Sequence, residues 1–222
     1  MPARARIMII DDHPIFRKGL AHLINEEPDM EVCGEAEDVP AAKKLIAGLA
    51  PDMVIVDLTL KGASGLELIR YIHELQPALP ILVISMHDES AYAERALKAG
   101  ARGYIMKQEM TVKVTGAIRQ VLHGKMSFSQ EIVENILGRV ASHAMPVPKD
   151  PVSMLSDREL EVFTLIGRGI GRQEMASLLN VSIKTIGSYR EKIKEKLGIK
   201  SSPALAKRAA DWVRSQEDLE GA

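Results

Sequence analysis

Short apolar runs alternate with longer amphipathic segments over the first 125 residues of the chain. Three uninterrupted runs cover Ile7–Ile10, Met53–Val56 and Ile81–Ile84, and two weaker runs cover Met30–Cys33 and Tyr104–Met106. Such runs are typical of strands that are covered on both faces of a sheet. The segments between them have helical period, at 14–26, 39–49, 64–75, 89–99 and 110–123. This alternation predicts right-handed crossovers and an α/β domain with a five-stranded parallel sheet.

The rest of the chain has helical periodicity and no strand-like run. Ser156–Glu159 fits a capping box at the start of a helix. Ser202 and Pro203 fit an N-cap serine followed by proline at the first position of the last helix. Two further helices are predicted at 172–179 and 183–197, separated by residues 180–182. Two helices joined by a tight turn in a small all-α domain are typical of a helix-turn-helix.

A proline-rich segment separates the two halves. Residues 141–151 contain three prolines and no apolar periodicity, which is typical of a linker. We therefore expect a first domain at 1–125, a linker at 126–153 with a candidate helix at 130–140, and a second domain at 154–222.

The charge of the chain is divided unevenly between these domains. The 222 residues have a formal net charge of −1. Residues 1–125 carry 15 Lys and Arg against 17 Asp and Glu, whereas residues 155–208 carry 11 against 6. This asymmetry indicates two modules with different partners, and the basic block favours a nucleic acid as the partner of the second.

Composition indicates an ordinary folded chain. Hydrophobic residues make up 46% of the sequence and charged residues 27%. The single Cys33 cannot form an intramolecular disulfide, and the first residues lack the apolar core of a secretory signal. No segment reaches the roughly 18 apolar residues that span a bilayer. We therefore expect a cytoplasmic protein with no membrane partner.

Polar side chains directly follow the predicted strands. They are Asp11, Asp12, Asp57, Ser85 and Lys107. Because the carboxyl ends of parallel strands meet at one edge of a sheet, these groups converge there. Three neighbouring carboxylates repel one another unless a cation compensates them, and oxygen ligands favour Mg²⁺, or Mn²⁺, over zinc. One carboxylate can then attack a phosphoryl group while the lysine and the hydroxyl bind its oxygens. The cluster predicts a phosphorylatable aspartate.

This half of the sequence resembles the receiver domain of two-component response regulators over about residues 6–123. The resemblance depends on Ile9-Ile10-Asp11-Asp12-His13-Pro14, Val56-Asp57, Gly65, Ser85 and Lys107. It implies a flavodoxin-like, doubly wound sheet in which Asp57 is the phosphoacceptor. It also implies that Asp12 and Asp57 bind Mg²⁺ together with the backbone carbonyl of Thr59, and that Asp11 acts through water.

The same resemblance implies roles around the phosphoryl group. Ser85 would donate a hydrogen bond to it, Lys107 would pair with it, and Tyr104 would rotate on activation. Thr59 and His87 occupy positions that influence the lifetime of the acyl phosphate, which leaves that lifetime open. The implied phosphodonor is a cognate histidine kinase or a small molecule, and the receiver would catalyse its own phosphorylation and dephosphorylation.

The second half resembles the LuxR-type DNA-binding domain. The matching residues are Leu155–Glu159, Glu174–Ala176, Val181-Ser182, Lys184–Ile186 and Lys196–Gly198. With a receiver in front of it, the chain resembles a response regulator of the NarL/FixJ type across nearly its whole length. The resemblance implies a transcription regulator rather than an enzyme.

The helix at 183–197 is the expected DNA-reading element. Its spacing directs Ile186, Tyr189, Ile193 and Leu197 to the core and turns Gly187, Glu191 and Glu195 outward with polar neighbours. The candidate DNA contacts are Lys184, Thr185, Ser188, Arg190 and Lys192, with Lys194 as a further phosphate contact. Gly187 and Glu191 stand where the family often has a long donor, and Glu191 could accept from a cytosine amino group.

We expect phosphorylation of Asp57 to control dimerisation and promoter binding, because one small module with few base-edge donors binds DNA weakly. Low aromatic content favours double-stranded DNA as the target. Two alternatives remain open at this point. One is a receiver that acts mainly through protein–protein interaction, with weak or lost sequence-specific DNA binding. The other is a small-molecule enzyme on the same sheet, for which no cofactor fingerprint is present.

Overall fold

The computed structural model of the protein describes residues 3–60, 63–130, 132–134 and 151–220, except for the side chains of residues 111, 112 and 216–220. The chain divides into two compact units, Met1–Ala141 and Ser142–Ala222. In the candidate helix at 130–140, residue 130 and residues 132–134 are helical, and the remainder lies outside the described residues. No described helix is long and apolar enough to cross a membrane.

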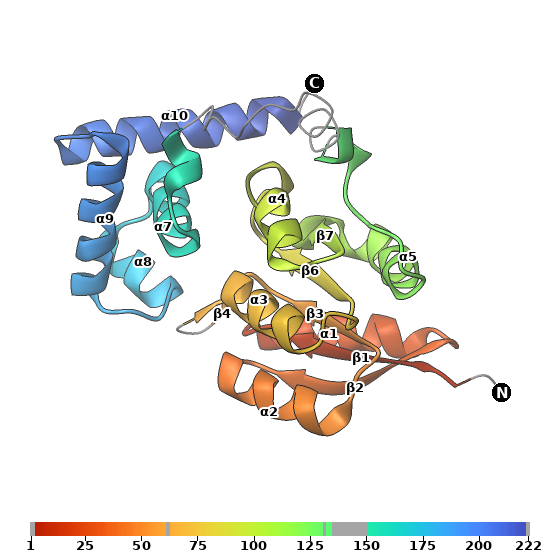
Figure 1. Ribbon diagram of the computed structural model, residues 1–222. Coiled ribbons are helices and arrows are strands. Elements are labelled where there is room, and N and C mark those ends of the chain that lie inside the picture. The colour runs from red at the N-terminus through yellow and green to blue at the C-terminus, as the bar shows by residue number, and fades with distance from the viewer. Residues whose placement is uncertain (1–2, 61–62, 131, 135–150, 221–222) are drawn as a thin grey trace. The chain divides into compact units, whose positions relative to one another are not determined.

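Five parallel strands form the sheet of the first unit, in the spatial order β2-β1-β3-β6-β7 (Figure 1). Their bounds are Ala5–Ile10 (β1), Met30–Ala36 (β2), Met53–Val56 (β3), Ile81–Ser85 (β6) and Gly103–Met106 (β7). Each expected strand is present, and the order is the flavodoxin-like, doubly wound one. In such sheets a ligand crevice lies at the carboxyl ends of the strands where the order reverses, here between β1 and β3.

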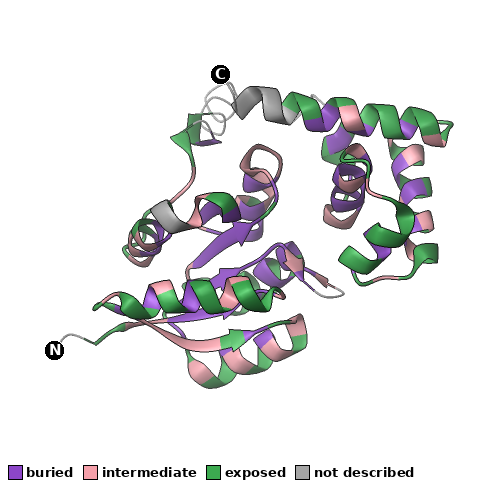
Figure 2. Ribbon diagram, turned by 180° about the vertical axis from the view of Figure 1, so that it is seen from behind, coloured by how far each residue is buried: buried purple, intermediate pink, exposed green. Residues whose placement is uncertain are grey.

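Five helices cover the two faces of this sheet. They are Pro14–Glu26 (α1), Val39–Leu49 (α2), Gly65–Leu75 (α3), Glu89–Ala99 (α4) and Met110–Leu122 (α5). α1 and α5 lie on one face, and α2, α3 and α4 lie on the other (Figure 1). β3 and β6 are buried throughout, and β1 is buried over its last four residues, whereas the helices expose their outer sides (Figure 2). Burial on both faces explains why the strands read as unbroken apolar runs.

A short antiparallel hairpin between β3 and α3 was not predicted. It pairs Thr59–Leu60 (β4) with Ala63–Ser64 (β5), and strands of two residues have no periodic signal in the sequence. At its end the Gly65 N–H donates to the Leu58 carbonyl at 2.7 Å. A Cβ on Gly65 would lie 2.1 Å from the Asp57 carbonyl oxygen, so only glycine permits this close return of the chain.

The second unit contains a 3₁₀ turn and four helices within its described residues. They are Pro151–Met154 (η2), Asp157–Gly167 (α7), Arg172–Leu178 (α8), Ile183–Leu197 (α9) and Ser202–Glu220 (α10). The capping box at the start of α7 forms as predicted, with both Ser156 and Glu159 bonds present. The turn between α8 and α9 contains Asn180 at φ 50°, a left-handed conformation that asparagine tolerates. The expected all-α helix-turn-helix domain is confirmed.

The cap of the last helix differs from the prediction by one residue. Ser201 caps α10, because its Oγ accepts from the Ala204 N–H at 3.3 Å and its carbonyl accepts from the Leu205 N–H at 3.0 Å. Ser202 is therefore already helical, and Pro203 is the second helical residue. Pro203 remains compatible with the helix, since the first turn leaves its backbone N–H groups without intrahelical partners.

Replacing Gly65 with alanine is expected to destabilise the first unit by about 1–3 kcal/mol, because the added Cβ overlaps backbone atoms next to Asp57. The matched control is Gly19→Ala on α1, where a Cβ meets no described atom within 4 Å and alanine favours the helix by about 1 kcal/mol. Urea unfolding followed by far-UV circular dichroism measures both. Fluorescence of Trp212, the only tryptophan, reports the second unit and should not change. Equal stability of the two variants would contradict the close approach.

Candidate functional site

The ends of β1 and β3 place acidic side chains next to each other. The Asp57 N–H donates to the Ile10 carbonyl at 2.9 Å, and the Asp11 N–H donates to the Ala36 carbonyl at 3.0 Å. These ladder bonds continue the strand pairing one residue past each strand. They hold Asp11 and Asp57 side by side, both almost fully buried.

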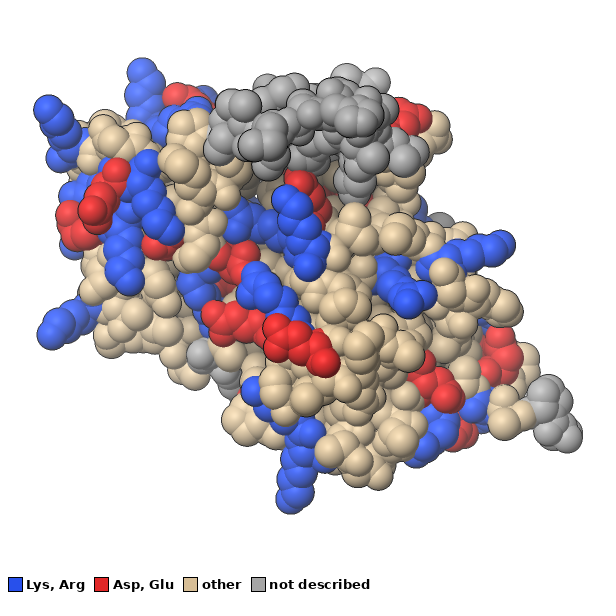
Figure 3. All heavy atoms as spheres, in the orientation of Figure 1, with Lys and Arg blue, Asp and Glu red and all other residues tan. Residues whose placement is uncertain are grey.

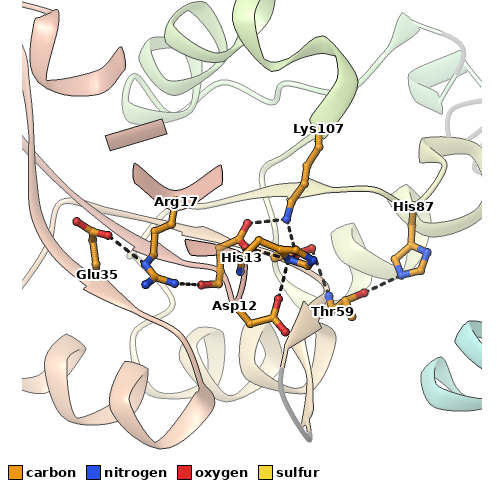
Figure 4. A network of polar contacts seen from close by, with 9 residues as sticks. Asp12, His13, Arg17, Glu35, Thr59, His87 and Lys107 are labelled. Carbon is orange, nitrogen blue, oxygen red and sulfur yellow. Dashed lines mark hydrogen bonds and ion pairs between the residues drawn. The ribbon is translucent and has the colours of Figure 1, made fainter. Parts of the chain in front are cut away.

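Lys107 joins the two buried carboxylates. Its Nζ lies 2.7 Å from Asp11 Oδ2 and 2.7 Å from Asp57 Oδ2 (Figure 4). The Phe16 ring of α1 lies below the ammonium group, with 4.3 Å from Nζ to the ring centroid. Burial would lower the pKa of Lys107, but the Asp57 and Asp11 charges outweigh it and raise the pKa. The lysine therefore stays protonated and neutralises part of the acidic charge.

The cluster retains more negative than positive charge. Burial, together with the Asp11 charge, raises the pKa of Asp57 to about 6 in spite of Lys107. One ligand atom from each of Asp11, Asp12, His13 and Asp57 lies within 4.8 Å of the others, and His13 Nδ1 is 2.8 Å from Asp12 Oδ1. Three carboxylates around one ammonium group fit a hard divalent cation that accepts oxygen ligands, such as Mg²⁺. A bound cation would offset the cost of keeping Asp57 charged.

Arg17 fixes the loop that follows β1. Its Nη1 donates to the Asp11 carbonyl at 2.5 Å, and its Nε pairs with Glu35 Oε2 at 3.0 Å (Figure 4). The Asp11 carboxylate in turn accepts from the His13 N–H at 2.7 Å. These bonds orient the acidic loop before any ligand arrives. No sequence signal points to Arg17, because its two partners are distant in the chain: Asp11 directly follows β1, and Glu35 lies on β2.

A second polar network extends from Asp57 toward the edge of the sheet. The Thr59 N–H donates to Asp57 Oδ1 at 3.3 Å, and Thr59 Oγ1 shares a hydrogen bond of 2.9 Å with His87 Nε2. The Tyr104 hydroxyl donates to the His87 carbonyl at 2.8 Å. Ser85 is fully buried at the end of β6, and its Oγ accepts from the His87 N–H at 3.2 Å. Four residues singled out in the sequence thus form one connected group with the Asp57 carboxylate.

Ring stacking as well as hydrogen bonding holds His87 in place. Its imidazole stacks on the Tyr92 ring of α4, with 4.5 Å between the ring centroids and 24° between the planes. Tyr92 and Tyr104 are both buried, and burial raises the pKa of Tyr104 well above its usual range. The Tyr104 hydroxyl is therefore a proton donor at any physiological pH. Tyr92 has no sequence signal that distinguishes it from a core aromatic.

The first residues of the predicted linker are bound to the same edge of the sheet. The Tyr104 N–H donates to the Ser127 carbonyl at 2.9 Å, and the Ser127 N–H donates to the Arg102 carbonyl at 2.9 Å. The Ser129 N–H donates to Glu89 Oε1 at 2.9 Å, at the start of α4. We refer to Ser127 and Ser129 with these partners as the linker clamp. It places the linker in direct contact with the backbone of Tyr104.

The outer side of α9 carries most of the expected DNA contacts. Lys184, Ser188 and Lys192 are exposed, and Thr185 is partly exposed. Arg190 differs from these residues: it is only 9% exposed, and burial lowers its pKa, so its side chain lies mostly on the buried side of α9 and its contact with DNA stays a prediction. The buried stripe follows Ile186, Arg190 and Ile193, whereas Tyr189 is only partly buried at its flank. Simple apolar spacing selected Tyr189 because it does not count the aliphatic part of an arginine.

An acidic cluster with a buried lysine at the switch point of a flavodoxin-like sheet, followed by a helix-turn-helix unit, is the arrangement of a response regulator. The family of the response regulator receiver domain matches residues 7–119, and the luxR family of bacterial regulatory proteins matches residues 153–209. The chain therefore belongs to the two-component response regulators that join a receiver to a LuxR-family DNA-binding domain.

Known proteins are similar to this chain over most or nearly all of its length. Oxygen regulatory protein NreC from Staphylococcus epidermidis is 34% identical over 209 residues, covering 92% of this chain and 96% of that protein. A LuxR-family response regulator from Aurantimonas sp. is 39% identical, with a TM-score of 0.57 over 63% of this chain and 99% of the solved one. RcsB from Salmonella enterica serovar Typhimurium, solved on promoter rprA with a phosphomimetic, is 28% identical, with a TM-score of 0.60 over 93% and 98%. These relatives favour the DNA-binding interpretation over the two alternatives.

Asp12→Asn is expected to weaken binding of Mn²⁺, used as a spectroscopic substitute for Mg²⁺, by about tenfold or more, because it removes one charged oxygen ligand. Titration followed by electron paramagnetic resonance measures the dissociation constant. Glu26→Gln is the matched control, since Glu26 pairs with His22 on the exposed side of α1 and its loss should leave the constant within about twofold. Equal weakening in both variants would indicate a diffuse charge effect instead of a site.

Proposed function

We propose that this response regulator accepts a phosphoryl group on Asp57 and thereby controls dimerisation and promoter binding in the cytoplasm. The observation that carries the proposal is the Lys107 ammonium group at 2.7 Å from both Asp11 and Asp57, in a chain that also has a helix-turn-helix unit. We assign the receiver to residues 1–125, the linker to 126–153 and the DNA-binding domain to 154–222.

The site residues divide the chemistry of the transfer among them. Asp12 and Asp57, with the Thr59 carbonyl and with Asp11 through water, would hold Mg²⁺ or Mn²⁺, which neutralises charge on the phosphoryl oxygens. An Asp57 carboxylate oxygen attacks phosphorus, and the bond from phosphorus to the phosphohistidine nitrogen or the acyl oxygen of a small donor breaks. Lys107 and the Ser85 hydroxyl bind the transferred oxygens. In this sense the receiver promotes its own phosphorylation, and attack by water reverses it.

The energy of these bonds is of the size that a switch requires. One to three charge-assisted hydrogen bonds to the phosphoryl group contribute about 1.5–3 kcal/mol each. Moving an equilibrium from 1:99 to 99:1 requires about 5.5 kcal/mol. Two or three such bonds are therefore sufficient, provided that they form only in the active packing.

The linker clamp connects this switch to the rest of the chain. When Ser85 turns toward the phosphoryl group, its Oγ leaves the His87 N–H, and the His87 carbonyl moves relative to the Tyr104 hydroxyl. Rotation of Tyr104 then disturbs the backbone bond to Ser127. We infer that phosphorylation loosens the clamp and thereby allows the DNA-binding domains to dimerise.

The DNA-binding domain works on double-stranded promoter DNA as a dimer. Lys184, Lys192 and partly buried Lys194 supply phosphate contacts, and Thr185 and Ser188 lie next to them on α9. A single domain with so few contacts has low affinity, so two half-sites are needed. In support, relatives include RcsB dimers solved on DNA.

Asp57→Asn is expected to abolish phosphorylation by acetyl phosphate with Mg²⁺, and with it the donor-induced gain in promoter affinity, because an amide is not a nucleophile for phosphorus. Phos-tag electrophoresis with hydroxylamine cleavage, and a gel-shift titration, measure the two effects. Asp29→Asn is the control, since Asp29 pairs with Arg119 at the surface and should behave as wild type. Identical DNA binding by wild type and Asp57→Asn in the presence of donor would refute the switch.

Glu89→Ala is expected to raise promoter affinity without phosphodonor and to reduce its further gain on phosphorylation, because it removes the acceptor for the Ser129 N–H. Glu94→Ala on the same helix is the control, since it also removes a glutamate from α4, one that pairs with Lys98 at i, i+4. Gel shifts with and without acetyl phosphate measure both variants. Unchanged basal affinity in Glu89→Ala would show that the clamp does not restrain the second domain.

A further inference from the structure

We propose that Glu191 recognises the exocyclic amino group of a cytosine in the major groove, and that the operator preference of this protein therefore depends on an acidic side chain. This inference rests on the proposed DNA-binding function and deepens it. It concerns which base is read, which neither the fold nor the relatives specify.

Glu191 lies in the middle of the outer side of α9. The inner side is defined by the buried residues Ile186, Arg190 and Ile193. At 100° per residue, Lys184, Ser188, Glu191 and Glu195 lie opposite this stripe. The Glu191 side chain is 73% exposed, and acidic side chains lie among the basic ones over α9 (Figure 3). A helix that enters the major groove with this side presents Glu191 to the base edges.

The neighbouring hydroxyl groups are already used within the helix. Thr185 Oγ1 shares a hydrogen bond of 2.7 Å with Ser182 Oγ, which also caps α9. Ser188 Oγ donates to the Lys184 carbonyl at 3.2 Å. The Ser188 hydroxyl cannot donate to a base without giving up its present bond, and the Thr185 hydroxyl can do so only when Ser182 is the donor in their shared bond. The Glu191 carboxylate therefore offers the stronger means of discrimination on this side of the helix.

The surroundings of Glu191 favour a close and oriented contact. One turn earlier, a Cβ on Gly187 would meet no described atom within 4 Å, so the surface beside Glu191 has room for a base edge. Lys194 Nζ lies 2.8 Å from Glu191 Oε2, and its side chain is only 16% exposed. This ion pair orients the carboxylate and reduces its repulsion from DNA, while the carboxylate retains further acceptor lone pairs.

The chemistry of the groove then selects the base. A carboxylate only accepts hydrogen bonds, and phosphate oxygens repel it. Guanine presents two acceptors in the major groove, and thymine presents an acceptor and a methyl group. Adenine has an amino donor, but its N7 acceptor lies next to it and repels the carboxylate. Cytosine presents the N4 amino group beside a C5–H instead of an acceptor on the same ring, so it is the favoured partner.

The test is a binding-site selection with the full-length protein, acetyl phosphate and Mg²⁺ on a double-stranded library with a randomised core. Wild type is expected to enrich cytosine at one position of each half-site. Glu191→Gln is expected to shift that position to adenine, because an amide pairs with adenine N6 and N7. Glu195→Gln, at another exposed glutamate of the same side, should keep the cytosine. Circular dichroism confirms that each variant is folded.

A base analogue gives an independent readout. In a selected operator, replacing the cytosine by 2-pyrimidinone removes only the N4 amino group. This should weaken wild type by about 5- to 150-fold and Glu191→Gln much less. Equal base preferences in wild type and Glu191→Gln, or a preference of wild type for guanine, would overturn the inference while leaving the DNA-binding function intact. Failure of phosphorylated wild type to select any sequence would overturn both.

Discussion

The shared contact of one buried ammonium group with two buried carboxylates is the interaction on which the receiver depends. Parallel pairing of β1 with β3 brings Asp11 and Asp57 together, and burial alone would make that pair unfavourable. Lys107, directly after β7, offsets part of this cost. Asp12 at the solvent side leaves a remaining negative charge, which suits a divalent cation and a phosphoryl group. The same charge balance thus serves both stability and chemistry.

From this centre, polar contacts extend in one direction through Thr59, His87 and Tyr104 to the linker. The buried environment makes such a route sensitive, because each polar group lost without replacement costs about 1–3 kcal/mol. A change in the charge of Asp57 is therefore expected to alter the hydrogen bonds along this route. The route ends at the linker clamp, where Ser127 and Ser129 are bonded outside the five strands.

In the second domain the sequence predicts local features but not the burial of every side chain. Its capping box, its turn at Asn180 and the bounds of α9 were all predictable, because they depend on residues close together in the chain. The burial of Arg190 was not, because an arginine can bury its methylenes while its charge remains at the rim. The resulting face is less basic than the net charge of the domain suggested. The proposed recognition of cytosine by Glu191 is consistent with such a face.

The sequence alone determined the five strands of the sheet and the helices between them, because unbroken apolar runs imply strands buried on both faces. It also determined which polar residues meet, because parallel strands collect the residues that follow them at one edge. The match of residues 7–119 to the receiver family and of residues 153–209 to the luxR family established the family of the chain. Only the tertiary structure decided that the Lys107 ammonium group contacts both the Asp11 and the Asp57 carboxylate. It also decided that Arg17 and Phe16 support the site, that Tyr92 stacks on His87, and that the linker pairs with β7. These contacts join residues distant in the chain. Their partners depend on side-chain packing in three dimensions, for which periodicity carries no information.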